Sequence, residues 1–128
     1  MRNNLYNFIA MRKDFDFWVY ILTNWKKTVL YVGVTNNLKR RLAEHYANRG
    51  KPETFAGRFS CYNLVYYEWY QYVDKAISRE KEIKKMLREH KDALIREVNP
   101  EWKFFNAFIC GKWPPEESGT RNEGDAKF

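Results

Sequence analysis

Two stretches near the start of the chain are rich in apolar, aromatic and β-branched residues. They cover residues 15–23 (FDFWVYILT) and 28–34 (TVLYVGV), and this composition is typical of β-strands. The residues between them, 24–27, form a short connection that contains two lysines and an asparagine. Two strands with so short a link predict an antiparallel hairpin.

A helix with one apolar stripe is predicted directly after the hairpin, over residues 36–48. The apolar positions recur every fourth residue, at Leu38, Leu42 and Tyr46. Arg41 and His45 are also four residues apart, so they share a face that flanks this stripe. Gly33 lies near the end of the second strand, where the missing side chain lets another group come close to the backbone. Gly50 marks the end of the helix.

The rest of the chain predicts one more strand and two more helices. The expected elements are a loop at 50–60, a strand at 62–72, a helix at 75–89 capped by Asp74, a helix at 91–97 and a segment at 102–109 that packs back on the core. Pro100 discourages continuation of the last helix. The order β-β-α-β-α-α predicts an α+β domain, with a small three-stranded antiparallel sheet flanked by helices.

The composition of the two ends differs from that of the middle. We expect residues 1–14 to be an N-terminal extension, 15–112 to be one domain, and 113–128 to be a disordered acidic tail. Neither a signal peptide nor a membrane-spanning apolar run is visible. Cys61 and Cys110 have no metal-ligand spacing, so we expect two free thiols in a protein of the reducing cytoplasm.

The charge of the chain favours a polyanionic partner. The formal net charge is +7 and the pI is near 9.4. The tail at 113–128 contains two basic and four acidic residues, which leaves 21 basic and 12 acidic residues in the rest of the chain. A basic body of this kind makes nucleic acid the first partner to consider, and no obligate protein partner is evident.

One carboxylate falls on the apolar stripe of the helix predicted at 75–89. The stripe consists of Ile77, Ile83 and Leu87, with Met86 beside it. Glu80 lies three residues after Ile77 and three before Ile83, so its side chain is expected to face the core. An unpaired charge there costs several kcal/mol. Glu80 therefore needs an arginine partner, a route to water at the edge of the stripe, or a divalent cation such as Mg²⁺.

Several short motifs occur together in a fixed order. They are Val19-Tyr20-Ile21, Tyr31-Val32-Gly33-Val34-Thr35, Arg41 with His45, Arg79-Glu80 and Asn99-Pro100-Glu101-Trp102. This combination resembles the GIY-YIG nuclease family, and most of all its small single-domain bacterial (UPF0213-like) members. Trp18 departs from the family pattern, because the first motif of the family has a glycine at this position.

The resemblance implies a fold, an activity and a set of site residues. The fold agrees with the one predicted above, and the activity is cleavage of phosphodiester bonds with one divalent metal ion, Mg²⁺ or Mn²⁺. The catalytic positions carried over are Tyr20, Tyr31, Arg41, His45, Glu80 and Asn99. Glu80 corresponds to the metal ligand and Gly33 to the glycine of the second motif.

Roles for these residues follow as hypotheses. Arg41 offers a charged fork to the phosphate, and Tyr31 or Tyr20 positions the attacking water and acts as its base. His45 either transfers a proton or holds Tyr31 in place. The residues expected to contact the nucleic acid are Gly33, Lys39, Arg40, Lys51 and Arg58; phosphate contacts of this kind give affinity without sequence choice.

The sequence leaves three functional readings. The first is a metal-dependent endonuclease acting on DNA, with branched or damaged DNA among its candidate substrates and with low sequence specificity. The second is a non-catalytic nucleic-acid-binding module on the same fold. The third is a protein-interaction domain whose basic face binds an acidic partner. An inward carboxylate at Glu80 favours the first, because a binding module would have no need for it.

Overall fold

The computed structural model of the protein describes residues 15–116. Its centre is a three-stranded antiparallel sheet with strand order β2-β1-β3. The central strand β1 is Phe17–Thr23, and the outer strands are β2, Leu30–Thr35, and β3, Asn63–Tyr70. The sheet therefore has β2 at one edge and β3 at the other.

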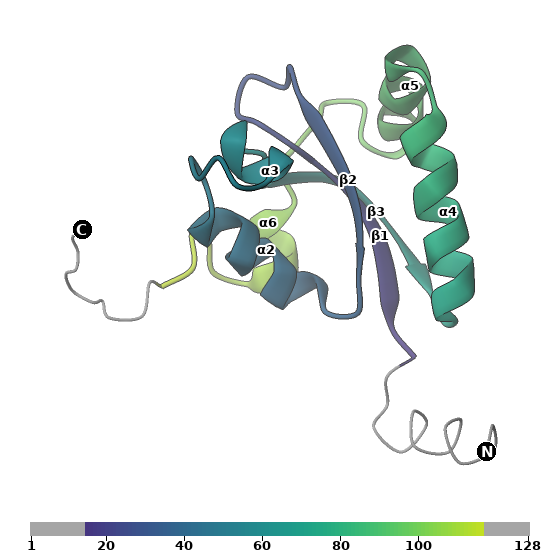
Figure 1. Ribbon diagram of the computed structural model, residues 1–128, viewed down its shortest axis with the longest axis horizontal. Helices are drawn as coiled ribbons and strands as arrows, with labels where there is room; N and C mark the ends of the chain where they lie inside the picture. The colour runs from purple at the N-terminus through teal and green to yellow at the C-terminus, as the bar shows by residue number, and fades with distance from the viewer. Residues whose placement is uncertain (1–14, 117–128) are drawn as a thin grey trace.

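Helices cover both faces of the sheet (Figure 1). On one face lie α4 (Val73–Lys85) and α5 (Arg88–Val98), and on the other lie α2 (Leu38–Ala47), α3 (Phe55–Arg58) and α6 (Asn106–Cys110). Side chains of β1 alternate between the two cores: Val19 and Ile21 pack toward α4 and α5, whereas Tyr20 and Leu22 pack toward α2. This double burial explains why the sequence of β1 is almost continuously apolar.

A β-bulge interrupts the pairing of β1 with β3. Ile21 pairs with Tyr66, but Leu22 pairs with Leu64, so Val65 is left as the additional residue. Both Val65 and Tyr66 consequently lie in the core beneath α4 and α5. The bulge changes the facing of every later residue in β3 relative to a regular strand.

The predicted fold class is confirmed, because all three strands and their antiparallel order are present. The helix predicted at 36–48 is also confirmed: Asn37 caps α2 by accepting a hydrogen bond from the backbone N–H of Arg40 at 2.9 Å, and Asn48 ends it. Two short helices were not predicted: α3 lies in the segment predicted as a loop, 50–60, and α6 lies at the end of the segment predicted to pack back on the core, 102–109.

The prediction of a helix at 75–89 is wrong in three respects, as the observed helix α4 shows. It begins at Val73, with Tyr72 at the N-cap and Asp74 in the first turn. Asp74 therefore does not cap the helix; its carboxylate interacts favourably with the positive end of the helix dipole. The helix ends at Lys85, and two extended residues separate it from α5. Its buried face consists of Ala76, Glu80 and Ile83, while Ile77 and Leu87 are exposed.

The predicted domain boundary at residue 112 also needs correction. Trp113 packs on the α2 core, with its ring centre 5.4 Å from that of Tyr46, so the folded part extends beyond 112. The extension at 1–14 and the tail from 117 onward lie outside the described residues. No helix among the described residues has the length and apolar character needed to cross a membrane.

Candidate active site

The site starts from the pairing of Tyr20 with Gly33 across β1 and β2. The phenol of Tyr20 lies directly against the backbone of Gly33, where a Cβ atom would approach Tyr20 Oη to 2.5 Å and Tyr31 Cε2 to 3.0 Å. Any larger residue would displace one of these rings. Gly33 thus admits the phenol, as its missing side chain predicted. Because Gly33 is itself buried, the structure gives it this role and not direct contact with nucleic acid.

His45 joins the two tyrosines from the last turn of α2. Its Nε2 atom lies 2.9 Å from Tyr20 Oη, and its ring centre lies 5.2 Å from that of Tyr31. Burial, reinforced by the charge of Arg41, lowers the pKa of His45 to about 4. Burial and the neighbouring Tyr31 phenol raise the pKa of Tyr20 above its usual value. At neutral pH the hydrogen bond therefore joins a neutral imidazole and a neutral phenol.

Arg41 brings a positive charge to the same cluster from the first turns of α2. Its Nη1 atom lies 2.9 Å from Glu44 Oε1, and its side chain is 37% exposed. Burial by itself would lower the pKa of Arg41, but hydrogen bonds to Glu44 and Tyr20 and the nearby Tyr31 raise it. Tyr31 is half-buried, so the cluster presents a phenol and a guanidinium at its solvent-accessible side.

Glu80 approaches from the opposite layer, on the buried face of α4. Helix α4 packs on β2, the edge strand that carries Tyr31. Glu80 Oε2 forms an ion pair with Lys84 Nζ at 2.8 Å. The hydrogen bond to Glu80 raises the pKa of Lys84; burial acts in the opposite direction, and the Tyr31 phenol adds to the rise. Glu80 and Tyr31 therefore lie near one ammonium group, at the edge of the sheet where the two layers meet.

The donor set near Glu80 can be compared with what a metal ion needs. Among residues 15–116 there is no group of three or more His, Cys, Asp or Glu side chains that could hold a metal. Mg²⁺ and Mn²⁺ accept one protein carboxylate when waters and substrate phosphates supply the other ligands. Glu80 fits that chemistry as a single ligand, provided that Lys84 gives up one carboxylate oxygen.

Asn99 is not brought to the cluster. Its Nδ2 atom donates to the carbonyl oxygens of Val65, at 2.9 Å, and Lys103, at 3.0 Å, and its Oδ1 atom accepts from the Lys103 N–H at 2.9 Å. Both N–H groups of the amide are thereby occupied. Val65 belongs to β3, at the edge of the sheet opposite β2. The structure assigns Asn99 to fixing the chain after α5, in place of the predicted catalytic contact.

The predicted phosphate contacts are exposed but spread over the α2 and α3 surface: Lys39, Arg40, Lys51 and Arg58. Arg40 donates to Asn36 Oδ1 at 3.2 Å and lies 3.6 Å from Glu44. Arg58 donates to the Pro52 carbonyl at 3.3 Å. Arg40 is adjacent to Arg41, whereas Lys51 and Arg58 lie beyond the other end of α2.

The comparison with protein families decides what this arrangement is. The GIY-YIG catalytic domain matches residues 16–93, more than half of the chain. The chain belongs to the GIY-YIG family. This range includes every residue of the cluster together with Glu80 and Lys84, and the family is one of nucleases.

Proteins similar to this chain include several that are named UPF0213 proteins. A UPF0213 protein of Natronomonas pharaonis is 40% identical over 80 residues, which is 62% of this chain and 91% of that protein. One from Staphylococcus haemolyticus is 38% identical over 80 residues, or 62% of this chain and 94% of that protein. The solution NMR structure of a UPF0213 protein from Bacillus halodurans has 24% identity, a TM-score of 0.45, and coverage of 69% of this chain and 90% of that one.

Two residues of this GIY-YIG site did not emerge from the sequence patterns. Glu44 lies three residues after Arg41 and binds its guanidinium. Lys84 lies four residues after Glu80 and binds its carboxylate. Both spacings place oppositely charged side chains next to each other on a helix. That rule could have found both once the two functional residues were recognised.

Proposed function

We propose that the protein is a metal-dependent endonuclease that hydrolyses DNA phosphodiester bonds with low sequence specificity. The observation that supports the proposal is the cluster of Tyr20, Tyr31, His45 and Arg41. The buried carboxylate of Glu80 lies on the helix that packs on the strand of Tyr31. A binding surface needs phosphate-binding cations, but it does not need a carboxylate held in the core. The basic body of the chain supplies the attraction for the DNA backbone.

In the reaction, a water oxygen forms a bond to phosphorus and the bond from phosphorus to the leaving oxygen breaks. Arg41 binds a non-bridging phosphate oxygen with the part of its guanidinium that Glu44 does not occupy, and stabilises the negative charge that develops there. Tyr20, whose pKa is raised, stays protonated and serves as a hydrogen-bond donor. Tyr31 is the half-exposed phenol. It positions the attacking water and, after its own proton has passed to solvent, accepts the water's proton as a phenolate, while the leaving oxygen takes a proton from solvent.

His45 acts as a positioning residue in this scheme. Its imidazole is buried and neutral above about pH 4, so at neutral pH it carries one ring proton and no positive charge. It holds the Tyr20 hydroxyl and packs edge-on against Tyr31. Glu80 would hold a divalent cation, which when bound supplies charge stabilisation to the phosphate and the leaving oxygen.

The low specificity follows from what surrounds the site. Residues 15–116 contain one small sheet and its helices, with no added element that resembles a sequence-reading module. The cations around α2 would contact phosphates, which carry no sequence information. Selection among DNA substrates would then depend on shape, ends or branches.

The test is cleavage of supercoiled plasmid and of branched DNA with Mg²⁺ or Mn²⁺. We expect the wild type to nick these substrates, and Glu80→Gln and Arg41→Ala each to reduce the rate by roughly 10²–10³-fold, as is usual for the loss of one charge-stabilising group. Lys85→Gln, an exposed change on the same helix, is the matched control and should cleave normally.

Two outcomes would contradict the proposal. Equal cleavage by the wild type and both site variants would point to a contaminating nuclease. Binding without cleavage on every substrate would assign the chain to the non-catalytic alternative.

A further inference from the structure

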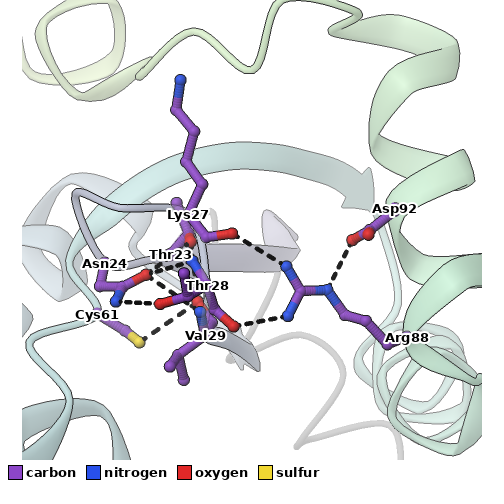
Figure 2. Close-up of polar contacts among 8 residues, drawn as sticks. All are labelled: Thr23, Asn24, Lys27, Thr28, Val29, Cys61, Arg88 and Asp92. Carbon is purple, nitrogen blue, oxygen red and sulfur yellow. Dashed lines mark hydrogen bonds and ion pairs between the residues drawn. The ribbon is translucent and has the colours of Figure 1, made fainter.

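The loop between β1 and β2 is held in one shape by its own side chains. Asn24 Oδ1 accepts hydrogen bonds from the backbone N–H groups of Thr28 at 2.9 Å and Val29 at 3.1 Å. Asn24 Nδ2 donates to Thr28 Oγ1 at 2.8 Å, and the Asn24 carbonyl accepts from the Lys27 N–H at 3.0 Å. Figure 2 shows the side-chain bonds converging on Asn24. One residue thus closes the whole turn.

A second element fixes the same loop from outside. Arg88, at the start of α5, donates from Nη1 to the Thr28 carbonyl at 2.8 Å and from Nη2 to the Lys27 carbonyl at 3.1 Å. Asp92 holds the other side of this guanidinium, with Oδ1 2.8 Å from Nε (Figure 2). The fork of an arginine leaves little freedom to a backbone that it binds at two successive carbonyls. The hairpin loop is therefore tied to α5 and is rigid.

This rigid loop displays an aromatic ring to solvent. Trp25 is 71% exposed, and Lys26 Nζ lies 5.5 Å from its ring centre. On the next residue, Lys27 Nζ lies 5.3 Å from the ring of Phe104, which is itself 40% exposed. A single exposed apolar side chain on a surface needs no explanation. A tryptophan on a preorganised turn with an ammonium group beside its ring matches the aromatic and cationic pair that binds single-stranded nucleic acid.

The loop is close to the candidate active site along the strands. Tyr31 pairs with Leu22, and the next pair, Thr23 with Leu30, is the last before the loop. Two residues of strand correspond to about 7 Å. A DNA strand that binds by a phosphate at Tyr31 and Arg41 and continues along the hairpin therefore reaches the loop that carries Trp25.

We propose that Trp25 stacks on an unpaired base of the DNA bound at the Tyr31–Arg41 site. The preferred substrate is then DNA with a single-stranded segment next to the cleaved bond, such as a flap, a gap or a branch. Bases in a closed duplex are already stacked on each other and offer no free face to the ring, whereas an unpaired base does. This inference rests on the proposed function, and it adds the feature that selects among DNA structures.

The experiment measures binding by fluorescence anisotropy in EDTA, which prevents cleavage. The probes are a labelled single strand, a duplex with a flap and a blunt duplex, all at one salt concentration. We expect Trp25→Ala to weaken binding of the single strand and the flap by roughly tenfold, and to leave the blunt duplex within about twofold. Trp25→Phe keeps a ring and should retain most of the affinity. Phe108→Ala, a change at a 78% exposed ring on α6, is the matched control and should bind like the wild type.

Several results would overturn the proposal. They are an unchanged affinity of Trp25→Ala for the single strand, an equal loss on all three probes, or an effect of the substitution confined to the oligomeric state in size-exclusion chromatography. The plasmid assay separates this inference from the proposed function. Cleavage by the wild type with no selective effect of Trp25→Ala defeats the stacking proposal alone. A selective loss of single-strand affinity in a protein that never cleaves defeats the nuclease proposal and retains the stacking surface.

Discussion

Two carboxylates, Glu68 on β3 and Glu80 on α4, differ in how fully they are paired. Glu68, on β3, accepts hydrogen bonds from the hydroxyls of Tyr66 and Tyr70 and from the Nε and Nη2 atoms of Arg79, the latter two at 3.0 Å. Glu80 is the next residue after Arg79 on α4, but in the part of the chain that the structure describes it pairs with one cation, the 53% exposed Lys84. Consecutive residues of α4 thus distinguish the two carboxylates: Arg79 helps to saturate Glu68, whereas Glu80 is under-occupied.

The difference separates a structural acid from a functional one. Four donors hold Glu68, and although burial opposes its ionisation, Arg79 and the tyrosines lower its pKa overall. Such a group is a fixed part of the fold and has no capacity left for a ligand. The Glu80 side chain is more withdrawn from water than that of Glu68, 12% against 19% exposed, yet its partner among the described residues, Lys84, has a flexible side chain that reaches solvent. Only Glu80 can exchange that partner for a metal ion.

Among the substitutions that test this difference between Glu68 and Glu80, the largest expected effect is on the free energy of unfolding. We predict that Glu68→Gln lowers the free energy of unfolding by about 1–3 kcal/mol, because Arg79 and two phenols lose their charged acceptor in a partly buried site. Glu80→Gln should change the free energy of unfolding by less than about 0.5 kcal/mol, because Lys84 can be hydrated. Urea unfolding of the two variants measures both values.

The matched control for this pair is Glu82→Gln. Glu82 also binds Arg79, at 3.0 Å, but it is 61% exposed, so its loss should cost less than Glu68→Gln. Equal destabilisation by Glu68→Gln and Glu80→Gln would remove the distinction. So would Mn²⁺ binding that survives Glu80→Gln in electron paramagnetic resonance.

The contribution of Glu68 should also depend on pH. Its folded pKa is lowered, so the folded state releases this proton more readily than the unfolded state. The stability that it provides is complete above the unfolded value of about 4.3 and is lost as the pH falls through the folded pKa. The gap in free energy between wild type and Glu68→Gln should therefore shrink below about pH 4. His45 titrates in both proteins and cancels in this difference, and a gap that stays constant down to pH 3 would contradict the prediction.

Much of the fold could be predicted from local pattern. The strands, the hairpin and α2 followed from aromatic runs, a short polar connection and capping residues such as Asn37. The break between α4 and α5 could not be predicted, since Met86 and Leu87 include neither glycine nor proline and are extended only in their tertiary context. The bulge at Val65 and the short helices α3 and α6 likewise depend on packing that a local pattern does not encode.

The sequence pattern likewise predicted one part of the candidate site and missed another. Periodicity placed Glu80 on the buried face of its helix, although it named Ile77 and Leu87 in place of Ala76 as a neighbour. Periodicity could not show how many donors pair with Glu80. That number depends on Arg79, the preceding residue, which pairs with Glu68 on β3. Asn99 matched a motif by order alone, and the hydrogen bonds that it makes to Val65 and Lys103 were not visible in the sequence.

The smallest expected effect concerns Lys84, the cation that pairs with Glu80 among the described residues. Lys84 Nζ lies 2.8 Å from Glu80 Oε2, so the ammonium and a metal ion held by this carboxylate would compete for it and repel each other. We predict that Lys84→Gln binds Mn²⁺ roughly three- to tenfold more tightly than the wild type in electron paramagnetic resonance titrations. Lys85→Gln removes the same charge from an exposed neighbouring position and should change the affinity much less. Weaker binding in Lys84→Gln would mean that the ammonium orients the carboxylate for the ion instead of competing with it.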